Sequence, residues 1–264
     1  MGWIRITEAF SAARSRGEGA LVAYLMGGDP DPGASRGYIA ALAEGGADVI
    51  EIGIPFSDPV ADGPTIQAAG VRALRAGTTP ETVLRIAAAV KRETGAPLVL
   101  MGYYNPIVRF GEEAFCAAAA ECGVDGLIVP DLPPEEATPL QEAAERHGLG
   151  LVFLVTPETR GDRARDIAAR TRGFLYLVSR YGTTGERRGL PPDIMGLIGR
   201  IRPLADLPLA VGFGISRPEH VQEVLDAGAD GAVVGSRLVR EVGAGSPPGA
   251  LRRLVRELKA ATRR

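Results

Sequence analysis

A carboxylate within an apolar run is the residue best placed for chemistry in this sequence. Residues 49–53 read Val-Ile-Glu-Ile-Gly, so Glu51 stands between two isoleucines. Side chains alternate across a strand, and the isoleucines suit a helix-facing side, which leaves Glu51 on the inner face. Burial raises the pKa of a carboxyl group, as a general acid near neutral pH requires. The alternative, a carboxylate paired with a buried cation or bonded to a backbone amide, is equally open at this point.

Two more carboxylates follow this segment. Asp58 and Asp62 lie four residues apart in a stretch dense in Pro, Asp and Gly. Either could be a turn residue that bonds its own backbone. Beside Glu51, they could instead divide the chemistry, one polarising a substrate N–H group and the other moving protons.

The second feature that could do chemistry is a set of glycine-rich stretches, at residues 179–189, 211–216 and 234–237. Glycine lets backbone N–H groups approach an anion closely, and a short helix beginning at Ser236 would direct its positive end to the same point. Such glycines also form ordinary tight turns, but three of these loops after late strands favour a phosphate site. We expect residues 180–192 to form a lid over the substrate, with an exposed loop as the alternative.

Short β-rich runs alternate with longer amphipathic runs along the chain. Most of the β-rich runs are continuously apolar, which is typical of parallel strands buried on both faces. The expected strands are 21–26, 48–54, 98–103, 126–129, 151–156, 174–179, 209–212 and 231–235. The expected helices are 34–44, 65–76, 80–93, 112–121, 134–146, 163–170, 193–202, 218–226 and 249–260.

Eight such units in 264 residues predict an α/β fold, a single (β/α)8 TIM barrel domain spanning residues 1–264. An extra N-terminal helix at residues 4–16 could plug the bottom of the barrel, and a short phosphate-binding helix would follow strand eight. No Ser- or Pro-rich linker divides the chain. A doubly wound open sheet is the competing architecture.

Composition argues against several other classes. Thirty basic and 32 acidic residues give a net charge of -2 without a basic stripe, so nucleic acid is not expected as a partner. No apolar run reaches the roughly 18 residues that a membrane span needs. Cys116 and Cys122 are expected to be reduced and buried in a cytoplasmic protein, and His147 and His220 are too few for a zinc site.

The segment from Glu51 to Pro64, Glu-Ile-Gly-Ile-Pro-Phe-Ser-Asp-Pro-Val-Ala-Asp-Gly-Pro, resembles the signature of the tryptophan synthase α family. The resemblance continues in order along nearly the whole chain. It includes residues 24–30 (Tyr-Leu-Met-Gly-Gly-Asp-Pro), 103–106 (Tyr-Tyr-Asn-Pro), 129–133 (Val-Pro-Asp-Leu-Pro), Tyr176 with 179–185, 212–216 (Gly-Phe-Gly-Ile-Ser) and Gly235-Ser236.

This resemblance implies roles for residues at the matching positions. Glu51 would be the catalytic acid and base, and Asp62 the second catalytic carboxylate. Tyr24 and Tyr176 would lie against the indole ring. Thr184 would be the lid residue that engages the Asp62 loop. The implied phosphate site consists of Gly185, Gly214, Gly235 and Ser236.

The resemblance also implies the activity, the cleavage of indole-3-glycerol phosphate to indole and glyceraldehyde 3-phosphate. It implies no metal, imine-forming lysine or organic cofactor, and Lys91 and Lys259 fall in expected helices. The implied partner is the β subunit, a pyridoxal-phosphate enzyme that receives indole through a tunnel in an α2β2 complex. Residues 57–64 and 105–108 would contact it.

Two positions depart from the family pattern. Gly102 stands where a β-branched residue is more usual, and we expect it to loosen the third strand. Arg237 stands where a small residue is more usual, and it would either add charge near the phosphate site or face solvent.

Three alternatives to the implied function stay open. The first alternative is another phosphate-binding barrel, such as a phosphoribosyl isomerase or indole-glycerol-phosphate synthase, for which Asp29 is the only candidate acid at the ends of strands one and five. The second is a non-catalytic regulatory subunit. The third is a free-standing lyase that releases indole without a partner.

Overall fold

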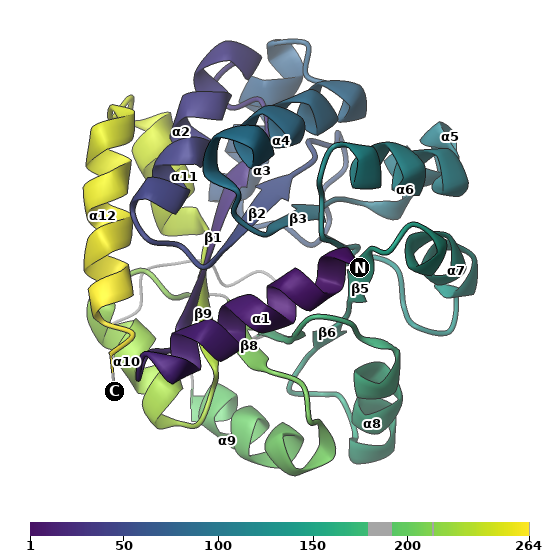
Figure 1. The fold of residues 1–264 in the computed structure, drawn as a ribbon, viewed down its shortest axis with the longest axis vertical. Coiled ribbons are helices and arrows are strands. Elements are labelled where there is room, and N and C mark those ends of the chain that lie inside the picture. The colour runs from purple at the N-terminus through teal and green to yellow at the C-terminus, as the bar shows by residue number, and fades with distance from the viewer. Residues whose placement is uncertain (179–191, 213, 264) are drawn as a thin grey trace.

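A computed structural model describes residues 1–178, 192–212 and 214–263 of the chain, in which parallel strands alternate with helices (Figure 1). The strands coincide with the expected ones to within about two residues at each end. They are β1 (Ala20–Met26), β2 (Val49–Gly53), β3 (Leu98–Met101), β4 (Gly126–Ile128), β5 (Gly150–Val152), β6 (Leu154–Val155), β7 (Leu175–Val178), β8 (Leu209–Gly212) and β9 (Gly231–Val234).

The order of the strands is that of a barrel. It runs β5-β4-β3-β2-β1-β9-β8-β7-β6, so β1 pairs in parallel with both β2 and the last strand, β9. One expected strand is split at Phe153 into β5, which pairs with β4, and β6, which pairs with β7. These two halves bring the ends of the sheet together, so the barrel prediction is confirmed and the open-sheet alternative is wrong.

Helices surround this ring of strands. They are α2 (Pro32–Glu44), α3 (Pro64–Arg75), α4 (Pro80–Thr94), α5 (Tyr104–Phe110), α6 (Glu112–Glu121), α7 (Thr138–Arg146), α8 (Gly161–Arg170), α9 (Pro192–Ile201), the 3-10 turn η1 (Arg202–Leu204), α10 (Pro218–Asp226), α11 (Ser236–Gly243) and α12 (Pro248–Ala260). The short α11 after the last strand was predicted. α5 was not, and α7 begins four residues later than expected because residues 133–137 form turns.

The N-terminal helix α1 (Gly2–Ser15) lies across one end of the ring, as Figure 1 shows. Its apolar residues Ile6, Phe10 and Ala13 belong to the same buried cluster as the inward side chains of the strands. The Phe10 ring lies 5.4 Å from that of Phe174 on the barrel floor. The prediction that this segment plugs the barrel is therefore confirmed.

Charged contacts fasten α1 to this end. Asp48, Asp125 and Asp230 each stand just before a strand, and each accepts a backbone N–H from the start of a neighbouring strand. Each aspartate also pairs with an arginine of the N-terminal segment, and the pairs are Arg16–Asp48 at 2.9 Å, Arg5–Asp125 at 3.7 Å and Arg14–Asp230 at 2.5 Å. The bottom of the barrel is thus joined by both apolar and ionic contacts.

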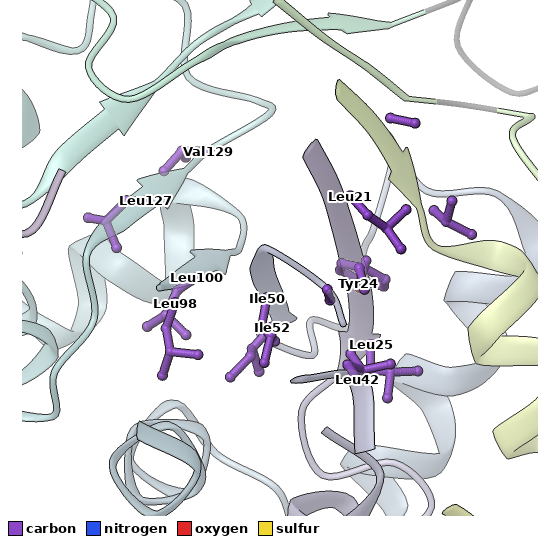
Figure 2. Close-up of a cluster of buried hydrophobic side chains, with 14 of the residues drawn as sticks. Leu21, Tyr24, Leu25, Leu42, Ile50, Ile52, Leu98, Leu100, Leu127 and Val129 are labelled. Carbon is purple, nitrogen blue, oxygen red and sulfur yellow. The ribbon is translucent and has the colours of Figure 1, made fainter. Parts of the chain in front are cut away.

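The two faces of β2 divide as the sequence predicts. Ile50 and Ile52 belong to the outer cluster between strands and helices, where Figure 2 shows them near Leu98 and Leu100. Val49 belongs to the cluster of buried side chains inside the barrel. Alternation therefore places Glu51 inside the ring.

The composition predicted that no segment spans a membrane and that both cysteines are reduced and buried. None of the described helices is long and apolar enough to cross a membrane. Both cysteines are free thiols, and Cys116 is buried while Cys122 is only half-buried, which differs from the expectation that both are buried. Burial raises the pKa of the Cys116 thiol to about 12.

Candidate active site

A pocket lies where several strands end and their loops begin, and its empty space, with the solvent at its open mouth included, is about 770 Å³. In barrels of this kind the loops at the C-terminal ends of the strands carry the active site. The lining residues are Tyr24, Glu51, Ala61, Asp62, Gly63, Ile66, Met101, Tyr176, Gly214, Ile215, Ser216, Val233, Gly235, Ser236, Arg237 and Arg240.

Glu51 is the buried acid of this pocket. It is only 1% exposed, and its Oε2 has no hydrogen-bond partner among the described residues. Burial, with a further contribution from the charge of Asp62, raises the pKa of Glu51 from 4.5 to about 8. No ion pair with Glu51 is found in the described part of the chain, so the buried-cation alternative gains no support there. A carboxyl in this state holds a proton at neutral pH and can deliver it.

Asp62 comes from the loop between β2 and α3. Burial raises its pKa to about 6, and a hydrogen bond with the Tyr103 hydroxyl opposes this rise. The loop is held in place because the Ala61 N–H donates to the Tyr103 hydroxyl at 2.9 Å and the Gln67 side chain donates to the Asp62 carbonyl at 2.9 Å. At neutral pH the two carboxyls therefore differ in state, Glu51 mostly protonated and Asp62 mostly ionised.

Asp58 behaves differently from Asp62. Its carboxylate is exposed, accepts a hydrogen bond from the hydroxyl of the preceding Ser57 and does not line the pocket. Asp58 therefore lies outside the pocket, whereas Asp62 joins Glu51 in it.

Two tyrosines form apolar walls of the pocket. Tyr24 stands beside Glu51 in the β1–β2 register, and Tyr176 extends from β7. Glycines make room for both rings. A Cβ at Gly53 would lie 2.2 Å from the Tyr24 hydroxyl, and one at Gly212 would lie 2.4 Å from a Tyr176 ring carbon. Burial raises both hydroxyl pKa values well above their usual range, so the two walls stay neutral.

The glycine-rich end of the pocket is built from two turns. Gly214 has a φ of 84°, in the left-handed region that favours glycine, and Gly235 is the N-cap of α11, which begins at Ser236. The Ser216 hydroxyl oxygen is buried and has no partner among the described residues. Buried His220 supports this turn, because its Nδ1 lies 3.2 Å from the Gly214 carbonyl oxygen and 3.4 Å from the Ser216 nitrogen. Free N–H groups at a helix start suit an anion.

The structure brings together most of the residues that the sequence singled out. Tyr24, Glu51, Asp62, Tyr176, Gly214, Gly235 and Ser236 all line the pocket, while Thr184 and Gly185 lie outside the described residues. Sequence reasoning gave no role to Tyr103, Ser216 or Arg240. Arg240 repeats three residues after Arg237, and this helical spacing is a signal that two cations share one face.

Asp29, the acid that an isomerase would use, is occupied elsewhere. It is 3% exposed and accepts two hydrogen bonds from the Arg72 guanidinium of α3, at 2.7 and 2.8 Å. It does not line the pocket. The alternative of a phosphoribosyl isomerase thus loses its only candidate acid.

The two departures from the family pattern have structural explanations. A Cβ at Gly102 would lie 3.0 Å from the Ile54 side chain, and the Gly102 N–H donates to the Ile128 carbonyl at 3.0 Å. Gly102 therefore allows close packing and keeps its bond to β4, which is opposite to the expectation that it loosens the strand. Arg237 lines the pocket, as the first of the two expectations for it requires.

Known proteins resemble this chain over nearly its whole length. A family model described as Tryptophan synthase alpha chain matches residues 10–262. A tryptophan synthase alpha chain from Methanosarcina mazei is 50% identical over 257 residues, covering 97% of this chain and 93% of the relative. One from Methanosarcina barkeri is 47% identical over 262 residues, covering 98% of each chain.

Solved structures agree. A Mycobacterium tuberculosis tryptophan synthase structure superposes with a TM-score of 0.92 at 38% identity, covering 98% of each chain. A structure of the tryptophan synthase α2β2 complex from Pyrococcus furiosus gives a TM-score of 0.87 at 44% identity, covering 91% of this chain and 98% of that one. This chain belongs to the tryptophan synthase alpha chain family.

Proposed function

We propose that this chain is the α subunit of tryptophan synthase and cleaves indole-3-glycerol phosphate into indole and glyceraldehyde 3-phosphate. The observation that carries the proposal is Glu51, a buried carboxyl inside the pocket with a pKa of about 8 and an oxygen that no described residue bonds. Its tyrosine walls suit a flat aromatic ring, and its glycine-rich end suits a phosphate.

Glu51 acts first as the acid. It delivers a proton to indole C3, and the ring becomes an indolenine-like cation that can accept the electrons of the bond to the glycerol chain. That bond then breaks, and its electron pair restores the indole. The glycerol carbon becomes an aldehyde as its hydroxyl loses a proton, and the Glu51 carboxylate takes this proton. One proton is given and one returned, so the acid is regenerated.

Asp62 stabilises the cation. As an ionised carboxylate it accepts a hydrogen bond from the indole N–H, where positive charge develops. A pKa of about 6 keeps it ionised at neutral pH, when Glu51 still holds its proton. Tyr24 and Tyr176 hold the ring between these two groups.

The other end of the pocket receives the phosphate. The turn at Gly214 and the start of α11 at Gly235 and Ser236 offer N–H groups and the positive end of a helix. The roles of Gly185 in this site and of Thr184 in closing a lid over it stay predictions from the resemblance.

The partner in this proposal is the tryptophan synthase β subunit, which the resemblance implies and which accompanies the α chain in the Pyrococcus furiosus α2β2 complex. Support comes from an apolar groove lined by the loop after β2 and by α5, including Phe56, Pro106 and Phe110. Val60 and Val108 in these two segments are 83% and 49% exposed. Large apolar side chains exposed in one area mark a protein contact.

Indole release from indole-3-glycerol phosphate, measured with and without a β subunit, tests the function. Wild type should release indole, and Glu51→Gln should lose about 10²- to 10⁴-fold in kcat because a proton donor is removed. The matched control is Glu257→Gln, an exposed carboxyl on α12, which should retain activity. No indole release by wild type in either condition would refute the proposal and favour a regulatory subunit.

The partner contact has its own test. Val60→Asp combined with Val108→Asp should weaken activation by the β subunit in a titration, because two charges would be buried in the contact. Met195→Asp, which changes an apolar residue on α9 that is 44% exposed, is the control. Equal activation in both variants would contradict the placement of the interface, and full activity of wild type without a β subunit would favour a free-standing lyase.

A further inference from the structure

The pocket has charges of opposite sign on different elements. Its carboxyls, Glu51 and Asp62, come from β2 and the loop that follows it. Its cations, Arg237 and Arg240, come from α11 on the other side of β1, because β1 pairs with both β2 and β9. The cations thus stand at the glycine-rich end, where the proposed function places an anion.

Arg237 is held against this end by an ion pair. It is in the first turn of α11, directly after Ser236, and its Nη1 donates to the Glu241 carboxylate one turn later. The two side chains are 29% and 25% exposed, so neither extends fully into water. A guanidinium presents five N–H donors in a rigid plane, and an ion pair through one nitrogen leaves others for a second acceptor.

Glu241 is itself fixed. The Ser246 hydroxyl donates to its Oε2 at 2.6 Å, and the Ser246 N–H donates to the Glu241 carbonyl at 3.0 Å. The hydrogen bond from the Ser246 hydroxyl and, to a smaller extent, the one from Arg237 hold the pKa of the Glu241 carboxyl below its usual range. Glu241 therefore stays ionised. Ser246, Glu241 and Arg237 therefore form a chain of hydrogen bonds that ends at the pocket wall.

We propose that Arg237 is a binding residue for the phosphate group of the substrate, and that Glu241 is the positioning residue that holds it. The inference rests on the proposed function and adds a charged contact to the backbone groups and the serine that the proposed function assigns to the phosphate. A phosphate monoester carries close to two negative charges at neutral pH, more than the partial charge of one helix end balances. A guanidinium beside the first turn supplies the missing charge.

The test is the steady-state kinetics of Arg237→Gln, which keeps much of the length and removes the charge. We expect KM for indole-3-glycerol phosphate to rise about 5- to 10-fold, somewhat less than the roughly 12-fold or more that a buried charged hydrogen bond contributes, because the site is partly exposed. The effect should fall on KM more than on kcat. With indole-3-glycerol, the substrate without its phosphate, wild type and variant should not differ. The KM of Arg237→Lys for indole-3-glycerol phosphate should lie between those of wild type and Arg237→Gln. Arg256→Gln, which removes an exposed arginine on α12, is the matched control.

Direct binding of inorganic phosphate by isothermal titration calorimetry gives a readout that does not need catalysis. Wild type should bind phosphate more tightly than Arg237→Gln, with a difference in affinity that shrinks as salt is added.

The role of Glu241 is tested by kinetics. Glu241→Gln should raise KM less than Arg237→Gln does, and the double variant should have the same KM as Arg237→Gln alone. A KM that falls in Glu241→Gln would mean that Glu241 competes with phosphate, which overturns its positioning role.

The possible failures are distinct. If wild type releases no indole, the proposed function fails, and phosphate titration still decides whether Arg237 binds the anion. If wild type is active and Arg237→Gln matches it in KM and phosphate affinity, Arg237 is only a surface partner of Glu241 and the inference is wrong. Equal loss with the phosphorylated and unphosphorylated substrates would also refute it. Urea unfolding of each variant checks that the fold is intact.

Discussion

Replacing Glu51 by glutamine should stabilise the protein in a way that depends on pH. Burial raises the pKa of Glu51 from 4.5 to about 8, so the folded chain keeps a proton that the unfolded chain has released. Stability therefore falls as the pH rises from about 4.5 to about 8. At about 1.4 kcal/mol for each unit of pKa, the ionised form costs up to about 5 kcal/mol at the upper end. Glutamine carries no proton to release and avoids this loss.

Urea unfolding of wild type and Glu51→Gln at pH 5, 6, 7 and 8 measures this cost. The free energy of unfolding of the variant should exceed that of wild type by a margin that is small at pH 5 and grows to about 3–5 kcal/mol at pH 8. Glu257→Gln, which removes an exposed carboxyl, is the control. A difference that stays constant with pH would show that Glu51 is not an unpaired buried acid, and the reasoning from its burial would fail.

Three further predictions concern activity and packing. The kcat/KM for indole release should be bell-shaped, falling below about pH 6 as Asp62 gains a proton and above about pH 8 as Glu51 loses its own, and Asp62→Asn should remove the acid limb. Gly53→Ala should push the Tyr24 ring out of place, which by overpacking costs about 1–3 kcal/mol of stability in urea unfolding and lowers kcat/KM. Phe10→Ala should destabilise the fold by about 3–5 kcal/mol through the cavity it leaves in the barrel floor, measured in the same way.

The sequence predicted the fold well because its signals are local. Apolar runs, most of them continuous, identified the strands apart from the division between β5 and β6, and the N-terminal plug was readable from its amphipathic pattern. The interruption at Phe153 was not readable, because residues up to Val152 pair with β4 and residues from Leu154 pair with β7. An apolar run does not say which neighbour each residue pairs with. The helix α5 was missed because it has seven residues with a proline in its first turn, where proline is tolerated but resembles a breaker.

The site was predictable in part for the same reason. Alternation alone placed Glu51 inside the ring, and two of the three glycine clusters proved to line one end of the pocket. Tyr103 could not be found in this way, because it meets Ala61 across 42 residues of sequence and only the closed ring brings them together. The pKa values of Glu51 and Asp62 likewise depend on burial by residues far apart in the chain, so their different protonation states needed the structure.

The distribution of paired and unpaired groups explains how the barrel tolerates such a site. Three buried side-chain oxygens lack a partner among the described residues, and two of them, on Glu51 and Ser216, face the pocket. At the opposite end, the aspartates that precede β2, β4 and β9 are all bonded to strand backbone and to arginines of the α1 segment. Unpaired buried groups cost stability, and paired ones at a well-packed end offset it. The bonded aspartates at one end of the strands thus offset part of the cost of keeping an acid without a described partner at the other end.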